Sequence, residues 1–380
     1  MDLLSLSTSG LQGFFTVIVP FLVVLTVIVF VHEMGHFLVA RWCGVKVDIF
    51  AVGFGRRIAS FVDKKGTRWQ IGWIPLGGFV KFAGDMSASS APDREALAHM
   101  SDEESETAFH KKSVAQRAAV VAGGPLANFI LAIAIFAALV MIVGRVVTAP
   151  IVDQVRPDSP AEAAGFAVGD TIKKIGSSEI ESFNDLQQIV SGSGGKELSF
   201  VVDRKGQLVT LQATPELREV TDGLGNKIRI GVLGITRNVQ NDRVIEKLGP
   251  MDALGYGFSQ TWFVIDRTFS YLGNVFAGRE KADQIGGPIR IAQVTGQVAA
   301  ISLVAVLNLA AVLSVSIGLI NLFPVPMLDG GHLLYYAIEA VRGKPLSERI
   351  QDYGMRVGLA LVVMLMLFAT YNDIRHLSIF

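Results

Sequence analysis

Two histidines and a glutamate near the N-terminus have the spacing of a metal-dependent hydrolase. His32, Glu33 and His36 form a His-Glu-x-x-His pattern. Positions i and i+4 share one face of a helix, so the two imidazoles can hold one metal ion while the carboxylate acts on water. Zinc suits this site, because it takes imidazole nitrogen, is redox-inert and acidifies water when one coordination position stays open. The pattern predicts one zinc per chain, with Glu33 as the catalytic base.

Two histidines leave a catalytic zinc one protein ligand short. Asp329 is the candidate third ligand, because it follows a long apolar stretch that Pro324 and Pro326 interrupt. A carboxylate at such a place is costly unless it is paired or binds a metal. The backbone groups freed by the prolines need water or polar partners, which fits a wet cavity. His332 is a rival ligand, but we expect it to face the membrane interface.

Four stretches that contain no Asp, Glu, Lys, Arg or His must position these residues: Leu3–Val31, Ala118–Gly144, Ile291–Leu328 and Val357–Asn372. About 20 apolar residues cross a bilayer. The first two stretches meet this length, the third exceeds it, and the fourth reaches it if Arg356 snorkels to the interface. We therefore predict four transmembrane helices.

The remaining residues carry the charge density of an ordinary soluble protein, which excludes both a simple soluble enzyme and a transporter with short loops. Lys and Arg total 34, as do Asp and Glu, so no basic surface suggests nucleic acid as a partner. One cysteine cannot form an internal disulfide. The first apolar run lacks a basic region before it, which favours a retained span over a signal peptide.

Basic residues follow the first and third predicted spans, and none lies among the first ten residues. Both following segments are therefore predicted to be cytoplasmic, and the region between the second and third spans extracytoplasmic. The first and third spans run in the same direction across the membrane. Their ends bring His32, His36 and Asp329 to one depth, toward the cytoplasmic side, without any assumption about the fold.

The connecting segments differ in character. Residues 45–82 alternate like strands around a turn at Asp63–Gly66, which predicts either a soluble β-hairpin or a sheet that dips into the bilayer. Residues 83–113 are polar and predict a mobile linker. Residues 251–278 predict an interfacial amphipathic helix rather than a fifth span.

The stretch Ser159–Gly165, followed by Gly169 and Asp170, resembles the PDZ domains of bacterial proteases. Such domains bind an extended peptide as an added strand at a sheet edge. Another small α+β module is the alternative. Strand-like segments around a turn at Asp203–Gly206, and a short capped helix over Ser182–Val190, fit either reading.

The predicted fold class is a polytopic α-helical membrane protein with a membrane-associated β-hairpin region and an extracytoplasmic α+β PDZ-like domain. Its predicted segments are the first span (1–40), the hairpin and linker (41–113), the second span (114–147), the PDZ-like domain (150–237), an interfacial segment (238–290), the third span (291–330), a cytoplasmic connection (331–350), and the fourth span with the C-terminal tail (351–380).

Three motifs in this order resemble the site-2 protease family, and most closely its bacterial regulator-of-sigma-E branch. They are HEMGH, the Gly123–Phe129 run GGPLANF, and NLFPVPMLDGG. The resemblance covers essentially the whole chain, although the best-known branch members carry two PDZ modules and only one fits here. It implies zinc ligands at His32, His36 and Asp329, and activation of water by Glu33. It also implies a membrane-dipping hairpin, and substrate contacts at Asn128, Asn321, Gly53, Phe54, Gly77 and Gly78.

The family resemblance implies hydrolysis of a peptide bond within or near the transmembrane segment of single-span proteins of the bacterial inner membrane. A pre-trimmed anti-sigma factor or a remnant signal peptide is the implied substrate, with a peptide segment or C-terminus bound at the PDZ-like domain. Two alternatives are a PDZ-type membrane adaptor with a structural metal, and a metal or proton transporter. The His-Glu-x-x-His pattern favours hydrolysis, because the glutamate has no role in a closed structural site.

Overall fold

The computed structural model describes residues 3–85, 102–221, 227–237, 244–278, 282 and 286–376. The chain forms two compact units. The first contains residues 1–136, 257–268 and 280–380, and the second contains residues 137–256 and 269–279. The candidate catalytic residues all belong to the first unit.

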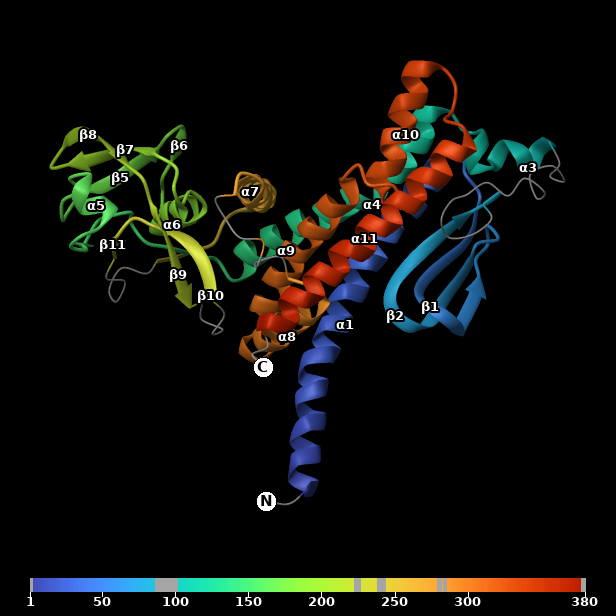
Figure 1. The fold of residues 1–380 in the computed structure, drawn as a ribbon, viewed down its shortest axis with the longest axis horizontal. Coiled ribbons are helices and arrows are strands. Elements are labelled where there is room, and N and C mark those ends of the chain that lie inside the picture. Colours follow the sequence, from blue (N-terminus) through green and yellow to red (C-terminus); the bar gives the residue numbers. More distant parts are fainter. Residues whose placement is uncertain are drawn as a thin grey trace. The chain divides into compact units, whose positions relative to one another are not determined.

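Within the described part of the chain, four helices are long and apolar enough to cross a membrane. They are α1 (Leu3–Trp42), α4 (Val114–Ile142), α9 (Leu303–Leu322) and α11 (Glu348–His376) (Figure 1). The predicted number of spans is therefore confirmed. Helix α7 (Pro250–Phe276) is not one of them, which agrees with the prediction that it is no fifth span.

The stretch predicted as a single third span is two helices. Helix α8 (Pro288–Ile301) ends at Ser302, whose extended backbone and side chain then begin α9 by accepting a hydrogen bond from the backbone N–H of Ala305. A serine at this position caps a helix, and the absence of charge around it conceals the break. The span is thus α9 alone. The predicted cytoplasmic connection likewise begins as a helix, α10 (Asp329–Arg342), which ends at the left-handed Gly343.

Glycines allow the membrane-length helices to approach closely. A Cβ added to Gly123 of α4 would lie 2.7 Å from the carbonyl oxygen of Gly35 in α1. A Cβ added to Gly318 of α9 would lie 3.2 Å from Cβ of Asn128 in α4. Small residues at such contacts let two helix backbones meet, and van der Waals packing then holds them together. Helices α1 and α9 therefore both contact α4 next to the candidate active site.

The predicted hairpin is present as β1 (Val47–Val62) and β2 (Arg68–Phe82). Residues 49–52 of β1 pair with residues near 68–71 and with residues near 78–81, so the first half of β1 lies between the two ends of β2. Figure 1 shows the resulting curved sheet beside α1. The second end of β2, residues 78–82, contacts α1 and reaches the candidate active site.

The hairpin turn is tied to the end of α1 by one carboxylate. Asp63 pairs with Arg41 of α1 and accepts hydrogen bonds from Trp69 Nε1 (3.2 Å) and the backbone N–H of Thr67 (3.0 Å). Burial raises the pKa of Asp63, but the hydrogen bonds from Trp69 and Arg41 outweigh it and hold that pKa well below its usual range. This charged anchor fixes the hairpin against α1.

Part of the predicted mobile linker is packed. Helix α3 (Asp102–Thr107) leads into a short 3₁₀ helix, η1 (Phe109–Lys111). The ring of Phe109 is fully buried and stacks on Phe82, with ring centroids 4.9 Å apart, while the carbonyl of Thr107 accepts a hydrogen bond from Lys46 (3.0 Å). The prediction is wrong for residues 102–113, because one buried aromatic ring outweighs a polar composition. Residues 86–101 of the predicted linker lie outside the described residues.

The second unit is an α+β fold. Its four-stranded sheet has the order β6 (Ser178–Glu179), β5 (Thr171–Ile175), β7 (Leu198–Arg204) and β8 (Gln207–Ala213). Three two-stranded pairs complete the strands: β10 (Lys227–Val232) with β9 (Glu216–Thr221), β11 (Ile235–Thr236) with β4 (Gln154–Val155), and β12 (Val244–Glu246) with β3 (Arg145–Val147).

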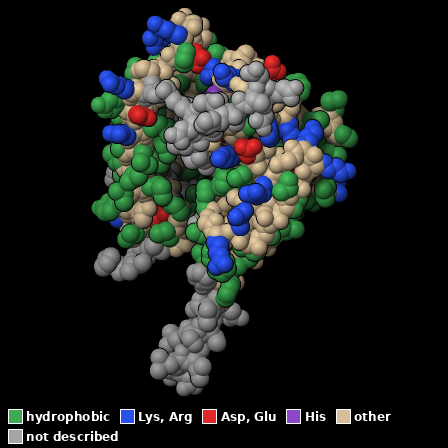
Figure 2. Space-filling model, turned by 90° about the vertical axis from the view of Figure 1, so that its right-hand side faces the viewer, with side chains coloured by type: hydrophobic (Ala, Val, Ile, Leu, Met, Phe, Trp, Pro, Cys, Tyr) green, Lys and Arg blue, Asp and Glu red, His purple; other side chains and the backbone are tan. Residues whose placement is uncertain are grey.

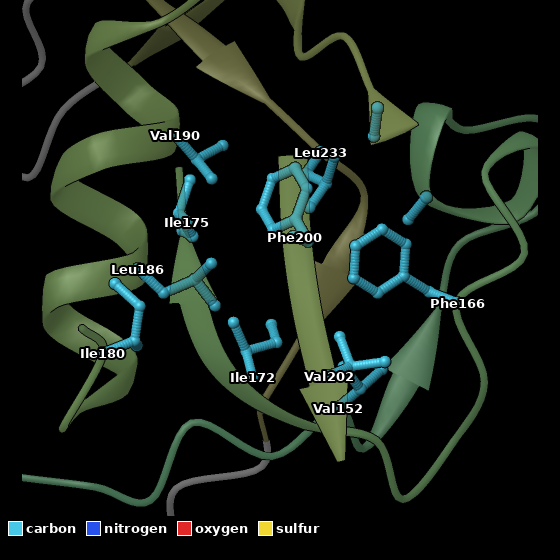
Figure 3. Close-up of a cluster of buried hydrophobic side chains, with 12 residues drawn as sticks. Val152, Phe166, Ile172, Ile175, Ile180, Leu186, Val190, Phe200, Val202 and Leu233 are labelled. Carbon is cyan, nitrogen blue, oxygen red and sulfur yellow. The ribbon is translucent and has the colours of Figure 1, made fainter. Parts of the chain in front are cut away.

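The core of this unit lies between the sheet and two helices, α5 (Pro160–Ala163) and α6 (Phe183–Gly192). Leu186 and Val190 of α6 point toward Ile175 and Phe200 on the sheet (Figure 3). The predicted capped helix is confirmed, because Ser182 and Asp185 form a reciprocal capping box at its start. The predicted turn at Asp203–Gly206 is also present, between β7 and β8.

The buried Asp170–Arg204 pair makes the second unit sensitive to acid. Arg204 donates hydrogen bonds of 2.7 Å to both carboxylate oxygens of Asp170, and the backbone N–H of Ala167 donates another of 2.9 Å. Burial raises the pKa of Asp170, but these bonds outweigh it and lower that pKa below the ordinary 3.8. A carboxyl with a depressed folded pKa stabilises the fold above its unfolded pKa, and the stabilisation disappears as the pH falls through the folded pKa.

We therefore expect pepsin to cleave residues 198–213 of the detergent-purified chain rapidly only well below pH 4. Asp170→Asn should already be cleaved rapidly at pH 4, where pepsin is active, because losing the charged acceptor costs about 1–3 kcal/mol. Glu179→Gln is the matched control, since its partner Lys174 and Glu179 are both exposed and such pairs contribute little. Equal resistance of Asp170→Asn and the wild type at pH 4 would contradict this role.

Candidate active site

The two histidines of the sequence motif converge on one point. His32 and His36 lie one turn apart on α1, and their Nε2 atoms are 3.2 Å from each other. Their rings are nearly perpendicular, with an interplanar angle of 85°. Both side chains are largely withdrawn from solvent. Two imidazole nitrogens this close and this well buried form half of a metal-binding site.

Asp329 completes the cluster from the other end of the sequence. Its Oδ2 lies 3.1 Å from His32 Nε2, and its Oδ1 lies 3.6 Å from His36 Nε2. Asp329 is the first residue of α10, and the turn before it holds Met327 at a positive φ of 95°. A Cβ on either Gly330 or Gly331 would collide with the backbone that leads from α9 into this turn. The two glycines therefore let α10 start against that backbone and direct Asp329 at the histidines.

This donor set fits zinc. One ligand atom from each of His32, His36 and Asp329 lies within 4.8 Å of the others. Oδ2 of Asp329 is buried, and its polar neighbour among the described residues is His32 Nε2, with which it forms no hydrogen bond, so a cation between the two atoms would satisfy both. Two imidazoles and one carboxylate are also a known catalytic zinc donor set, which leaves one coordination position open.

Helix α4 supplies the outer surroundings of the ligands. The carbonyl oxygen of Val120 lies 2.9 Å from Nδ1 of His36, so it can accept the Nδ1 proton and leave Nε2 free for a metal. Gly124 lies directly over the two Nε2 atoms, and a Cβ there would be 2.8 Å from Nε2 of His32 and closer still to that of His36. The glycine therefore leaves the space in which the ligands meet.

The side chain of Glu33, on α1, lies against the sheet. A Cβ added to Gly78 of β2 would be 3.0 Å from Cγ of Glu33, and Val80 of the same strand lines the cavity together with Glu33. The missing side chain at Gly78 thus lets the strand approach the carboxylate. Glu33 points into the same cavity as the metal cluster but is not one of the three clustered ligands.

A cavity of about 380 Å³ opens at the cluster, a size that suits a short extended peptide segment. It brings together residues from α1, α4, β2, α9, the turn before α10, α10 itself and α11. They are His32, Glu33, His36, Gly78, Phe79, Val80, Phe82, Val121, Asn321, Met327, Asp329, His332, Tyr336 and Met355.

The structure brings some predicted substrate contacts to this cavity and leaves others outside its lining. Asn321 and Gly78 line it. Asn128 is fully buried behind His32, with its amide nitrogen 3.2 Å from His32 Nδ1.

The other predicted substrate contacts lie on the sheet. Phe54 stacks on Phe79, with ring centroids 6.2 Å apart, and Gly77 lies beside the Phe54 ring. Gly53 lies against the carbonyl of Ile74, with a positive φ of 83°.

Several cavity residues were not identified from the sequence. His332 was expected at the interface but lines the cavity, and Tyr336 lines it one turn further along α10. Burial raises the pKa of Tyr336 to about 12, so its hydroxyl keeps its proton at neutral pH. The spacing of Asp329, His332 and Tyr336, three and then four residues apart, places them on one helical face and is the signal that would have found them.

Comparison with known proteins agrees with this geometry. Peptidase family M50 matches residues 20–365, so the chain belongs to that family. The "Putative zinc metalloprotease Atu1380" of Agrobacterium fabrum is 47% identical over 379 residues, which cover 99% of this chain and 100% of that protein. The "Metalloprotease MmpA" of Caulobacter vibrioides is 41% identical over 390 residues, covering 97% and 98%. The "Putative zinc metalloprotease R01501" of Rhizobium meliloti is 49% identical over 359 residues, covering 94% and 96%.

The chain is thus a zinc metalloprotease with four helices able to span a membrane. Membership of this site-2 protease family confirms the resemblance seen in the sequence. It also removes the adaptor and transporter alternatives as primary activities.

Gly124→Ala tests the space above the metal ligands. The added methyl group would displace the imidazoles of His32 and His36, so we expect zinc affinity to fall about tenfold or more. Zinc bound to the purified chain can be measured by mass spectrometry during titration with a chelator. Gly255→Ala in α7 is the control, because a Cβ there has nothing within 4 Å and zinc binding should not change. Unaltered affinity in Gly124→Ala would mean that the ligands meet elsewhere.

Proposed function

We propose that this chain hydrolyses a peptide bond within or near the transmembrane segment of single-span membrane proteins. The observation that carries the proposal is the position of His32 and His36 on a membrane-length helix, Phe15–Trp42. His32 lies ten residues before Trp42, or about 15 Å along the helix. That distance is half of a hydrocarbon core of about 30 Å. A substrate bond must therefore come to the site inside or beside the bilayer.

The ligands proposed for zinc are His32, His36 and Asp329. When bound there, zinc supplies Lewis-acid polarisation of a carbonyl and acidifies water. Glu33 accepts a proton from the water that attacks the amide carbon, and it then donates that proton to the departing nitrogen as the C–N bond breaks. The products are one carboxyl end and one amino end, and Glu33 returns to its starting state.

Substrate positioning is proposed for the edge of β2 and for Asn321. An unwound transmembrane segment exposes backbone groups that find no partner in lipid. Residues 78–80 of β2 line the cavity and can offer backbone hydrogen bonds, and the side chain of Asn321 lies on the cavity wall. Gly53, Phe54 and Gly77 are proposed to act from the same sheet, by shaping the strand that presents Gly78.

The hairpin is proposed to dip into the bilayer from the cytoplasmic side. Both of its strands expose large apolar side chains, including Ile58, Phe61 and Trp73, which are 63%, 64% and 73% exposed. On the face shown in Figure 2, exposed hydrophobic side chains lie next to Lys and Arg side chains, with few Asp or Glu. Apolar side chains with basic neighbours suit a membrane interface with anionic lipid.

The proposed location is the bacterial inner membrane, with the second unit outside the cytoplasm. Basic residues after the first and third spans support this orientation. The α+β fold and the Ser159–Gly165 motif support a PDZ-like domain that binds a peptide segment or C-terminus. Substrates already trimmed on their outer side, such as an anti-sigma factor, or remnant signal peptides fit this arrangement.

Glu33→Gln separates chemistry from metal binding. Glutamine has nearly the same shape and can still hydrogen-bond to water, but it cannot accept a proton. We expect zinc to stay bound while cleavage of a tagged single-span substrate falls about 10²-fold to 10⁴-fold. Measuring both quantities on one detergent-purified preparation tests the assignment.

Asp329→Asn is the companion variant, and it should lower zinc occupancy and cleavage together. A zinc chelator should likewise stop cleavage by the wild type, and added zinc should restore it. Cleavage by Glu33→Gln at the wild-type rate would refute the proposed base.

The proposed orientation is testable at Cys43, the single cysteine, which follows α1 and is partly exposed. A membrane-impermeant maleimide should label it in inverted membrane vesicles and leave it unlabelled in intact cells. Cys43→Ser is the control for background labelling. Labelling in intact cells would reverse the orientation.

A further inference from the structure

Asn128 does not take part in the chemistry proposed above, yet it is among the most buried polar residues of the first unit. It lies on α4 with no exposed surface, and its amide nitrogen is 3.2 Å from Nδ1 of His32. Its Oδ1 is buried and has no hydrogen-bond partner among the described residues. Burying an amide with one end hydrogen-bonded and the other end unpaired costs folding free energy, so the burial of Asn128 needs a physical explanation.

The explanation depends on which ring nitrogen of His32 carries the proton. A neutral imidazole carries one proton, on either Nδ1 or Nε2. If the amide nitrogen of Asn128 donates to Nδ1, the proton must sit on Nε2, which is the atom that faces Asp329 and His36. A protonated Nε2 has no lone pair for a metal. This orientation of the amide is therefore incompatible with zinc at the cluster.

Rotating the amide by 180° exchanges its oxygen and nitrogen without changing its shape. Oδ1 then accepts the proton of Nδ1, and Nε2 of His32 presents its lone pair to the metal. Only one end of this amide reaches a partner, so metal binding selects the orientation with the oxygen toward His32. Val120 does the same for His36 with a backbone carbonyl at 2.9 Å.

Helix α9 also packs against Asn128. The hydroxyl of Ser314 in α9 donates a hydrogen bond of 2.8 Å to the backbone carbonyl of Asn128. Gly318, one turn later in α9, lets that helix pack against Asn128 Cβ. Asn128 is not one of the residues that line the cavity. The side chain thus faces His32 from a rigid position and is screened from a substrate in the cavity.

We infer that Asn128 is a positioning residue, which sets the tautomer and ring orientation of His32 for zinc, rather than a residue that binds substrate. The inference rests on the proposed assignment of His32 as a zinc ligand. It changes what a substitution at Asn128 should affect, because a positioning residue acts on metal affinity whereas a substrate contact acts on KM.

The experiment measures zinc affinity, by chelator competition, in the full-length purified protein. Asn128→Leu removes the acceptor at similar volume and should weaken zinc about 10-fold to 100-fold. Asn128→Asp keeps an oxygen acceptor in either orientation and should bind zinc within a few-fold of the wild type. Asn321→Leu is the matched control, since Asn321 lines the cavity and donates its amide hydrogen bond to Ile317 of its own helix. Its zinc affinity should not change.

Two results would overturn the inference. Wild-type zinc affinity in Asn128→Leu, with a raised KM, would return Asn128 to substrate binding. Equal weakening in Asn128→Leu and Asn128→Asp would reduce it to a packing residue. His32→Ala separates this inference from the ligand assignment. If His32→Ala still binds zinc, the assignment of His32 as a zinc ligand is refuted. If His32→Ala loses zinc while Asn128→Leu binds it with full affinity, only the positioning role of Asn128 is refuted.

Discussion

Desolvation of three polar side chains is the constraint on which this structure depends. His32, His36 and Asp329 converge inside a group of apolar helices, where an unpaired polar group costs several kcal/mol. Such residues persist in a membrane-length helix only when each finds a partner. Nδ1 of His36 faces the carbonyl of Val120, and Nδ1 of His32 faces Asn128. The remaining atoms face one another, and a zinc ion at the proposed site would satisfy all of them at once.

Close approach of helix backbones makes this arrangement possible. Outer partners on α4 can reach both histidines only because Gly35 and Gly123 let α1 and α4 meet without intervening side chains. Gly124 then leaves the volume above the ligand nitrogens, and Gly330 directs Asp329 toward them. Glycine lowers helix stability in water, but a tight apolar contact repays this through van der Waals packing. The glycine-rich motifs of this chain are therefore part of the proposed metal site.

The role proposed for the sheet is to hold a peptide substrate at membrane depth. Lipid offers no hydrogen bonds, so an extended substrate needs a protein backbone beside it. The second end of β2 lies against Glu33 and lines the cavity, so the same strand contacts the proposed base and borders the space proposed for substrate. The pairing of Arg41 with Asp63 and the stacking of Phe82 on Phe109 hold this strand in position. In the proposed mechanism, the base and the substrate therefore both lie against one anchored strand.

The sequence alone determined the features that depend on local spacing and composition. His32 and His36 are one helical turn apart, and Glu33 is next to His32. Charge-free runs mark the four predicted spans because charge is excluded from lipid. Alternation marked the hairpin, and Ser182 marked the start of α6. Asp329 was accessible to the same reasoning, because a carboxylate at the end of an apolar run needs a partner.

Only the tertiary structure decided features that arise between residues distant in the chain. The break at Ser302 is invisible within an uncharged run, and the burial of Phe109 depends on Phe82 of another element. The family resemblance implied a substrate contact at Asn128, and the structure shows that the amide of Asn128 lies 3.2 Å from Nδ1 of His32. His332 belongs to the cavity because α10 starts against the end of α9. Composition reports what a segment can bury, but only packing determines which partner it meets.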